Sequence, residues 1–579
     1  MTQGSVLAAP AAAPKSVVQP KWWKEAVVYQ VYPRSFKDSD GDGIGDLNGV
    51  TEKLDYLKSL GVDVIWLSPH FDSPNVDNGY DIRDYRKVMA EFGTMADFDR
   101  MLAQMKKRHM RLIIDLVVNH TSDEHRWFAE AAKGPDNPYR DYYIWRDGKA
   151  AGQGGGPPNN YTSFFGGSAW EQATPGSQYY LHYFAKQQPD LNWDNPKVRD
   201  DVYDVMRFWL DKGVSGFRMD VIPFISKDPA FPDLTVEQAK HPDVVYADGP
   251  KLHAYLKDMN RRVLSKYDTM TVGEAVGVSL AQSPKFTSAS AGELNMIFHF
   301  DAVNIDRDGW RTKAWTLPEL KAVYTRLDQS AGTDGWNTSF LTNHDKPRAV
   351  SHFGDDRPQW RGVSAKALAT MMLTLRGTPF IYQGDELGMT NYPFKTIADY
   401  EDISARNLWK GQVESGKVPA AVVLDNLSRT SRDNSRTPMQ WSSTAQGGFT
   451  TGKPWLAVNP NYATINAAQE VADHASVYQH YQRLLTLRGK TPALVYGDYL
   501  DVDPGAEKVF AYTRTLGAER YLVLINFAET PLDYALPSGL QIKATVLDNG
   551  NQSRAPKAGA DKVMLQPWQA TIYKLAAGG

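Results

Sequence analysis

Eight short apolar runs, most of them followed by a segment with helical periodicity, constrain the fold of this chain more than any other feature. Each run is nearly continuous in apolar residues, which is typical of strands buried on both faces of a parallel sheet. Strands that alternate with helices favour a closed (β/α)8 barrel. The sequence therefore predicts an α/β protein built on a TIM barrel, with strands within residues 26–33, 62–69, 111–120, 216–221, 270–275, 295–300, 338–345 and 378–384.

Three other segments interrupt or extend this alternation. Residues 121–195 contain many aromatic residues and few helical patterns, and we interpret them as a subdomain inserted after the third strand. Residues 388–451 resemble a long polar loop, a helix over 477–488 closes the barrel, and short alternating runs beyond it predict an antiparallel β-sandwich. The predicted parts are a disordered leader (1–24), a catalytic barrel in two pieces (25–120 and 196–494), the inserted subdomain (121–195) and a C-terminal domain (495–579).

Composition excludes several classes of protein. A net charge of -3 gives no electrostatic basis for binding nucleic acid or an anionic membrane surface. No apolar run approaches the ~18 residues of a membrane span, and the absence of cysteine excludes thiolate catalysis and cysteine-ligated metals. The Ala- and Pro-rich residues 1–20 favour a periplasmic or secreted protein, with a cytoplasmic one as the alternative. The oligomeric state has no signal in the sequence, and a monomer is the default expectation.

Polar side chains gather where the predicted strands end. Asn119 and His120 close the third run, Asp220 the fourth, Glu274 the fifth, and His344 and Asp345 the seventh. The reacting groups of a (β/α)8 barrel collect at the carboxyl ends of its strands. Since unrelated core or loop residues would not all choose one end, these side chains predict an active site.

Two carboxyl groups on neighbouring strand ends are what cleavage of a glycosidic bond with retention requires. Arg218, on the same side of its strand as Asp220, would lower the pKa of Asp220 and keep it ionised as the nucleophile. The apolar neighbours of Glu274 would favour its protonated form, which can act as the acid. Asp345 would strengthen hydrogen bonds to the sugar as positive charge develops, and His120 and His344 would bind its hydroxyls.

An acidic loop near the N-terminus has the spacing of a cation site. In the segment 38–46, carboxylates recur at every second residue and once more four positions later, and glycines permit a tight turn. The bidentate glutamate of an EF-hand is missing, because Gly49 stands at the twelfth position. The loop predicts one structural calcium or magnesium ion remote from the chemistry, and no cofactor for catalysis, with ligands from Asp38, Asp40, Asp42, the Ile44 carbonyl and Asp46.

These motifs together resemble the α-amylase superfamily, glycoside hydrolase family 13. Its four sequence regions are similar, in order, to residues 115–120, residues 216–220, Glu274 and residues 343–345. The resemblance implies that Asp220 is the nucleophile, Glu274 the general acid/base and Asp345 the stabiliser of the transition state. It also implies that Arg218, His120 and His344 line the glucose subsite.

Residues 188–192, Gln-Pro-Asp-Leu-Asn, resemble the marker of the oligo-1,6-glucosidase group, which includes sucrose isomerases. In this group, residues matching Asp77 and Arg432 grip the far hydroxyls of the terminal glucose and close the subsite into a pocket. The resemblance therefore implies that single glucosyl units are removed. It places four other residues on the pocket wall, namely Tyr80, Phe164, Phe184 and Gln188.

The resemblance leaves two activities to separate. Segments 351–360 and 384–394 look most like sucrose isomerases, which retain fructose with a clamp of two phenylalanines and a basic segment. Here Val276 replaces the first phenylalanine, Phe300 keeps the second, and the basic segment loses its leading arginine at Asn304. Val221 after the nucleophile resembles the α-1,6-cleaving glucosidases.

Because half of the clamp is missing, we expect water to compete with fructose. The predicted activity is hydrolysis of isomaltulose, trehalulose, isomaltose or sucrose, with isomerisation or transglucosylation as the alternative. A non-catalytic sugar-binding module, the hypothesis from another class, would be expected to lose Asp220 or Glu274, and both are present.

Overall fold

A computed structural model describes residues 20–150, 152, 155–174, 176–247, 249–550 and 556–576. Eight parallel strands form the central sheet, in the order β11-β10-β9-β5-β2-β1-β15-β14. The sheet closes where Thr338 Oγ1 of β14 donates a 3.0 Å hydrogen bond to Ile297 O of β11. All eight strands fall inside the predicted runs: β1 (Val28–Val31), β2 (Val64–Leu67), β5 (Arg111–Leu116), β9 (Gly216–Met219), β10 (Met270–Glu274), β11 (Met296–Phe298), β14 (Thr338–Ser339) and β15 (Thr378–Tyr382).

Helices surround this barrel, and local signals set their ends. The helix α6 begins at Pro196, where the side chain of Asn195 accepts from Lys197 N, and ends before Gly213 at φ 108°. The helical segment over 47–60 is split in two at Lys53. The larger barrel helices are α2 (Leu47–Glu52), α3 (Leu54–Leu60), α4 (Met95–Lys107), α6 (Pro196–Lys212), α8 (Leu252–Arg262), α10 (Leu317–Ala331), α12 (Arg361–Thr374) and α17 (Val477–Lys490).

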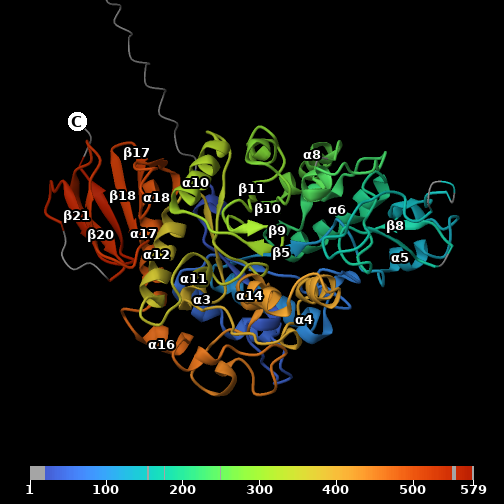
Figure 1. Cartoon of the computed structure of the whole chain (residues 1–579), viewed down its shortest axis with the longest axis horizontal. Helices are drawn as coiled ribbons and strands as arrows, with labels where there is room; N and C mark the ends of the chain where they lie inside the picture. Colours follow the sequence, from blue (N-terminus) through green and yellow to red (C-terminus); the bar gives the residue numbers. More distant parts are fainter. Residues whose placement is uncertain are drawn as a thin grey trace, which may run out of the picture.

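The segment after the third strand forms a small sheet at one end of the molecule, coloured cyan in Figure 1. Its strands β6 (Trp145–Arg146), β8 (Tyr179–Leu181) and β7 (Trp170–Gln172) pair antiparallel, and α5 (Arg126–Ala131) precedes them. The segment returns to the barrel through a bridge between His120 and Asp190. It thereby places its aromatic side chains over the carboxyl ends of the strands.

The segment predicted as a long polar loop, 388–451, is instead partly helical. It contains α13 (Ile403–Trp409), α14 (Ala420–Thr430) and α15 (Asp433–Arg436). Buried Val423 and Leu427, four residues apart on α14, pack with Tyr400 and Phe394 in a small core of their own. The apolar spacing of α14 is the helical signal that the polar composition of the segment concealed.

The C-terminal part is an antiparallel β structure at the opposite end of the molecule (Figure 1). One sheet has the order β16-β17-β18-β22-β20, and β19 pairs with β21. The helix α12 is buried from Ser364 to Thr374 and contacts β18 and β22 as well as α17, so it joins this part to the barrel. The strands are β16 (Asp498–Asp501), β17 (Val509–Leu516), β18 (Glu519–Asn526), β19 (Leu532–Ala535), β20 (Ile542–Asp548), β21 (Lys562–Leu565) and β22 (Ala570–Leu575).

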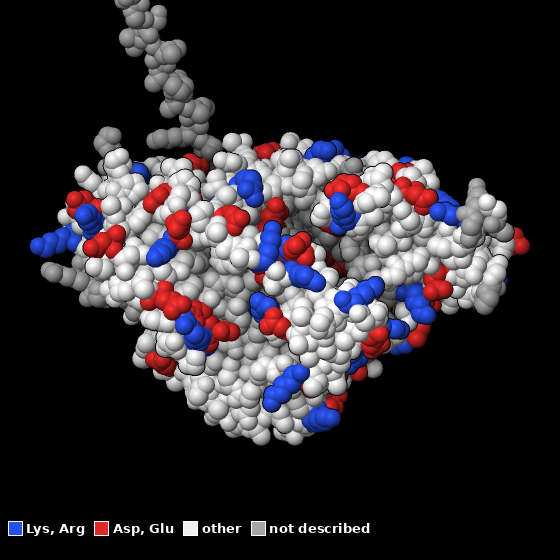
Figure 2. All heavy atoms as spheres, viewed as in Figure 1, with Lys and Arg blue, Asp and Glu red and all other residues white. Residues whose placement is uncertain are grey.

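Residues 1–19 of the predicted leader lie outside the described residues. At its end the prediction of disorder is wrong, because Trp22–Glu25 form the short helix α1 and Trp22 Nε1 donates to Asp268 Oδ1 at 2.7 Å. Within the described part of the chain, no helix combines the length and the apolar character that crossing a bilayer requires. The surface carries both signs of charge, and it is hollowed near the middle of the face in Figure 2.

Candidate active site

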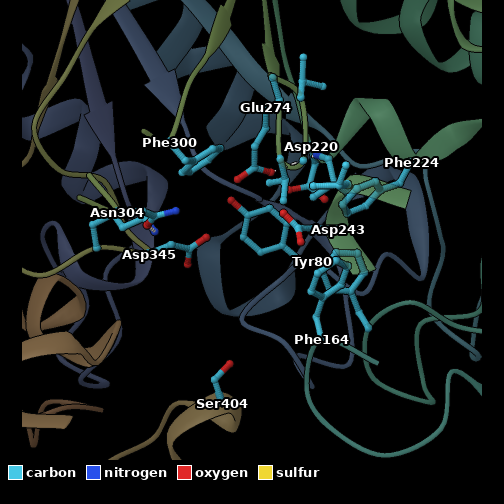
Figure 3. Close-up of a pocket in the computed structure, with 18 of the residues that line it drawn as sticks. Tyr80, Phe164, Asp220, Phe224, Asp243, Glu274, Phe300, Asn304, Asp345 and Ser404 are labelled. Carbon is cyan, nitrogen blue, oxygen red and sulfur yellow. Dashed lines mark hydrogen bonds between the residues drawn. The ribbon is translucent and has the colours of Figure 1, made fainter. Parts of the chain in front are cut away.

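A cavity of about 770 Å³ opens at the carboxyl ends of the barrel strands. Figure 3 shows Asp220 and Glu274 extending into it from neighbouring strand ends, with Asp345 on another wall. Each of the three predicted catalytic residues therefore reaches the same space. Seven of the ten predicted substrate-binding residues also line the cavity: Asp77, Tyr80, His120, Phe164, Phe184, Phe300 and Arg432.

Arg218 organises the catalytic carboxyl groups from below. Its side chain is 1% exposed, and its guanidinium contacts Asp220 Oδ1 at 2.6 Å and Glu274 Oε2 at 2.7 Å. A third carboxylate, Asp115, lies 2.5 Å from the same guanidinium. One planar cation thus fixes the separation of the two catalytic carboxyl groups and leaves Asp220 Oδ2 and Glu274 Oε1 for the cavity.

The backbone after β9 also helps to orient Glu274. Val221 adopts φ 34° and ψ 41°, in the left-handed region that β-branched residues rarely occupy. In this conformation, Val221 N donates a 3.0 Å hydrogen bond to Glu274 Oε2. Backbone strain of this kind is typical of functional sites, where the surrounding structure holds it in place.

The electrostatics differ from the sequence-based prediction in one respect. Burial raises the pKa of Asp220 well above its usual range, and the lowering by Arg218 does not outweigh it. The predicted net lowering of the pKa of Asp220 is therefore wrong, although Arg218 itself acts in the predicted direction. One guanidinium faces three carboxyl groups, and the negative charges of Glu274 and Asp115 add to the effect of burial on the pKa of Asp220.

Asp345 is held in its ionised form by its neighbours. Burial acts against its charge, but His344, Arg432 and Arg436 together hold the pKa of Asp345 well below its usual range. Arg436 Nη2 contacts Asp345 Oδ1 at 2.6 Å, and Arg432 Nη1 lies 3.4 Å from the same oxygen. A permanently negative group at this wall can stabilise positive charge that develops on a sugar ring.

The far end of the cavity is closed by charged side chains. Arg432 Nη2 lies 3.3 Å from Asp77 Oδ1, and Arg432 Nε donates to Asp402 Oδ1 at 2.9 Å. Gln188 Nε2 donates to the other oxygen of Asp77 at 3.2 Å. Asp402 is the N-cap of α13, so the helical part of segment 388–451 is what positions this closure.

Gln188, Arg218 and His344 lie beneath the cavity wall, each at most 1% exposed. His344 Nε2 hydrogen-bonds to Tyr80 Oη at 2.6 Å, and its Nδ1 hydrogen-bonds to Gln30 Nε2 at 2.8 Å. Burial lowers the pKa of His344 to about 3 and that of His120 to about 4, so both rings are neutral at pH 7. His344 and Gln188 thus orient Tyr80 and Asp77, which themselves face the cavity.

Aromatic rings line the two sides of the cavity. Phe164 stacks on Phe184 with ring centroids 5.2 Å apart, and Phe184 lies 5.1 Å from His120. Phe300 faces the cavity from beyond the end of β11, and Val276 lies beyond the end of β10. The rings of the inserted segment therefore line one side of the cavity and Phe300 another.

Four further side chains in or beside the cavity escaped prediction from the sequence: Asp115, Asp402, Arg436 and Lys346. The signal for Arg436 was present, because it follows Arg432 by four residues, the spacing that places two side chains on one helix face. Asp402 carried no such signal. It comes close to Arg432 only through the fold of segment 388–451.

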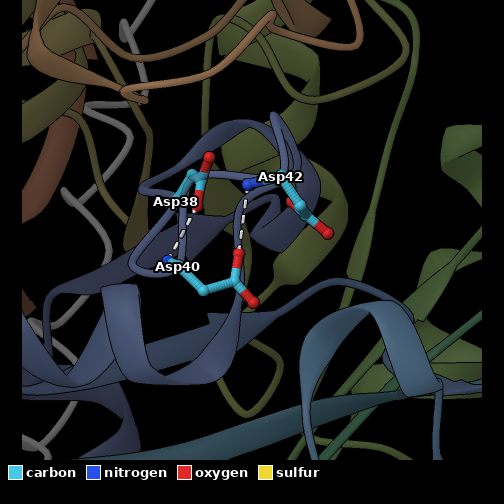
Figure 4. Close-up of side chains that lie close together, drawn as sticks. All are labelled: Asp38, Asp40 and Asp42. Carbon is cyan, nitrogen blue, oxygen red and sulfur yellow. Dashed lines mark hydrogen bonds between the residues drawn. The ribbon is translucent and has the colours of Figure 1, made fainter.

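Part of the predicted cation site comes together. Asp38, Asp40 and Asp42 each offer an oxygen, and these atoms lie within 4.8 Å of one another (Figure 4). Such hard oxygen donors fit calcium or magnesium. Asp46 is outside this group, since its carboxylate accepts from Ser39 N at 2.7 Å and from Gly49 N at 2.8 Å as the cap of α2.

A barrel that presents two carboxyl groups side by side in a pocket closed at one end defines an enzyme that cleaves glycosidic bonds. Residues 30–497 match the family described as "Alpha amylase, catalytic domain". The chain belongs to the α-amylase family and is a glycoside hydrolase. The resemblance drawn from its sequence motifs is confirmed.

Two relatives found by sequence comparison are described as glucosidases. The chain is 50% identical over 563 residues to an oligo-1,6-glucosidase of Parageobacillus thermoglucosidasius, which covers 96% of this chain and 99% of that protein. It is 46% identical over 564 residues to a glucan 1,6-alpha-glucosidase of Streptococcus pneumoniae, with 96% of this chain and 100% of that protein covered.

Solved structures with a similar fold are described as synthases. The isomaltulose synthase of Klebsiella sp. LX3 superposes with a TM-score of 0.94 at 57% identity. The trehalulose synthase of Pseudomonas mesoacidophila MX-45 gives the same TM-score and the same identity. Both comparisons cover 96% of this chain and 100% of the other, so the whole architecture is shared with sucrose isomerases.

Proposed function

We propose that this protein is a retaining, exo-acting α-glucosidase that hydrolyses small α-glucosides through a covalent glucosyl intermediate on Asp220. Its substrates would be isomaltulose, trehalulose, isomaltose and sucrose. The observation that carries the proposal is the single guanidinium of Arg218, which holds Asp220 and Glu274 side by side in one closed pocket. Retaining enzymes place their two carboxyl groups about 5 Å apart.

The steps follow from the atoms that face the pocket. Asp220 Oδ2 attacks the anomeric carbon while Glu274 Oε1 protonates the leaving oxygen. Glu274 then takes a proton from water, which attacks the same carbon and returns Asp220 to its free form. Asp345 faces the ring and stabilises the positive charge of both transition states.

The closed end of the pocket supports an exo mode of action. Asp77 and Arg432 form an ion pair there, and Asp402 holds Arg432 in place. A sugar chain cannot extend past this pair, so the non-reducing glucose would stop against it. Burial raises the pKa of Asp77 to about 6, which leaves it ionised at neutral pH to accept hydrogen bonds from sugar hydroxyls.

The leaving-group side supports hydrolysis over isomerisation. Val276 and Phe300 both line the cavity, so one side of a two-phenylalanine clamp is aliphatic. A pair of aromatic rings in contact contributes about 0.5–1.5 kcal/mol beyond its buried area, and we take a contact between a ring and the leaving sugar to be of similar size. Without that contribution, fructose leaves sooner and water reaches the glucosyl-enzyme.

Sucrose isomerisation is the second candidate, and one observation favours it. The isomaltulose and trehalulose synthases share 57% identity with this chain over its whole architecture. The relatives described as glucosidases share at most 50% among those reported above. The alternatives differ in a single step, namely which acceptor attacks the glucosyl-enzyme.

Incubation with sucrose and with isomaltulose separates these candidates. Chromatography should find free glucose and fructose as the main products from both sugars. Isomaltulose or trehalulose as the main product from sucrose would replace the hydrolase proposal with the isomerase. Asp220→Asn should abolish turnover, and an activated fluoroglucoside should label Asp220 in the mass spectrum of the wild-type protein. A label on another residue would refute the assigned nucleophile.

We also propose that Asp38, Asp40 and Asp42 bind one structural calcium or magnesium ion. A ligand present at about 100 times its Kd stabilises a folded protein by roughly 2.7 kcal/mol. Removal of divalent ions with a chelator should therefore lower the melting temperature, and calcium should restore it. Asp40→Asn with Asp42→Asn should abolish this response. An equal response in that double variant would place the ion elsewhere.

A further inference from the structure

Lys346 is a charged residue of the cavity that the proposed mechanism does not use. It follows Asp345 directly, and its backbone is held in a turn in which Lys346 N donates to Asn343 O at 3.2 Å. Thr342 Oγ1 donates to Lys346 O at 3.3 Å in the same turn. The turn that presents Asp345 to the sugar therefore also fixes the direction of Lys346.

The ammonium group of Lys346 is only partly satisfied by the protein. Nζ donates to Asn304 Oδ1 at 2.6 Å and lies 5.2 Å from the centroid of the Phe300 ring. Among the described residues, Asn304 is its one hydrogen-bond acceptor. An ammonium group has three N–H donors, so part of its capacity remains for a molecule in the cavity.

The position of Lys346 corresponds to the leaving group and not to the glucosyl unit. The residues at the closed end, Asp77 and Tyr80, are 4% and 5% exposed. The residues around Lys346, which are Val276, Phe300 and Asn304, are only half-buried and lie toward the open side. A glucosyl unit bound at the closed end would place its leaving group beside Lys346.

We propose that Lys346 is a specificity-determining residue that hydrogen-bonds hydroxyl groups of the leaving sugar. The inference rests on the proposed function, since it assumes that the glucosyl unit occupies the closed end. Asn304 holds the ammonium group and Phe300 supports it, so the three side chains form one recognition surface. This surface distinguishes sugar leaving groups from leaving groups that carry no hydroxyls.

The test compares isomaltulose with p-nitrophenyl α-glucoside, whose leaving group has no sugar hydroxyls. The readout is the ratio of kcat/KM for isomaltulose to kcat/KM for the nitrophenyl glucoside. Lys346→Met should lower this ratio about 10- to 100-fold, as expected for the loss of a hydrogen bond from a charged donor. Lys346→Arg, which keeps the charge and the donors, should recover most of it.

Lys285→Met is the matched control, because Lys285 is exposed on α9 (Ser283–Thr287). The substitution makes the same chemical change at a position outside the cavity lining. Its ratio should equal that of the wild type. If Lys346→Met melts early, Lys346→Gln takes its place with the same expected loss. A ratio within about 2-fold of wild type in the folded variant would overturn the inference.

Failure of the proposed function would look different. If the wild type makes isomers from sucrose, the hydrolase proposal fails, and the effect of Lys346→Met can still be measured on sucrose consumption. If the wild type uses the nitrophenyl glucoside but no disaccharide, both proposals fail.

The pH dependence gives a second readout. Burial and the nearby charge of Arg307 together lower the pKa of Lys346 to about 8, against the opposing effect of Asp345, Glu274 and Asp306. The KM for isomaltulose should therefore rise above pH 8 in the wild type, as the ammonium group loses its proton, and this rise should be absent in Lys346→Met. A rise of equal size in the variant would contradict the role of the charge.

Discussion

Replacement of Val276 by phenylalanine tests the step that separates hydrolysis from isomerisation. Val276 lines the cavity beyond β10, and Phe300 lines it beyond β11. A ring at position 276 would complete an aromatic pair around the departing fructose. The backbone that follows Val276 packs closely against its neighbour, because Gly277 has φ 75° and a Cβ at that position would lie 2.2 Å from Asp243 O.

The size of the effect follows from the contact that is added. An aromatic contact contributes about 0.5–1.5 kcal/mol beyond the area that it buries. Since about 1.4 kcal/mol is a factor of ten, fructose attack should gain about 2- to 12-fold over water attack. The cavity of about 770 Å³ is large enough for the ring to be added without blocking the glucose end.

The assay is the ratio of isomaltulose plus trehalulose to free glucose after incubation with sucrose. Val276→Leu serves as the control, because it adds apolar volume without a ring. Val276→Phe should raise the ratio and Val276→Leu should leave it near the wild-type value. An unchanged ratio in Val276→Phe, or an equal rise in both variants, would refute the argument that the missing ring permits hydrolysis.

Three further predictions concern the catalytic and closed-end residues. Glu274→Gln should lower kcat/KM for isomaltose by about 10²- to 10⁴-fold, the range of acid–base catalysis, and lower it much less for a nitrophenyl glucoside, whose leaving group needs little protonation; equal losses would argue against Glu274 as the acid. Arg432→Met leaves buried Asp77 unpaired and should lower kcat/KM at least about 30-fold, whereas Arg429→Met, on the exposed side of α14, should have no effect. Burial raises the pKa of Asp77 to about 6, so kcat/KM should fall as the pH drops through that value and Asp77 becomes neutral; a profile that is flat down to the ordinary range of aspartate would contradict this.

The sequence determined the barrel and most of the site. Buried parallel strands are nearly continuous apolar runs, so all eight strands could be placed from local composition. Barrel topology then brings the carboxyl ends of the strands together, which is why Asp220, Glu274 and Asp345 could be assigned to one site before any coordinates were known. The tight acidic turn of 38–46 was also predictable, because the spacing of its carboxylates and glycines is a local property of the sequence.

The tertiary structure decided the electrostatics of the catalytic carboxyl groups and the closure of the pocket. Arg218 contacts Asp115 and Glu274 as well as Asp220, and burial outweighs its effect on the pKa of Asp220. Neither contact can be deduced from neighbours in the sequence, because each joins side chains on different strands.

The contact between Arg432 and Asp402 could likewise not be predicted from the sequence. Asp402 approaches Arg432 only after a polar segment folds into helices around a small core of its own. Desolvation and long-range contacts depend on how the whole chain packs, and only the folded molecule specifies them.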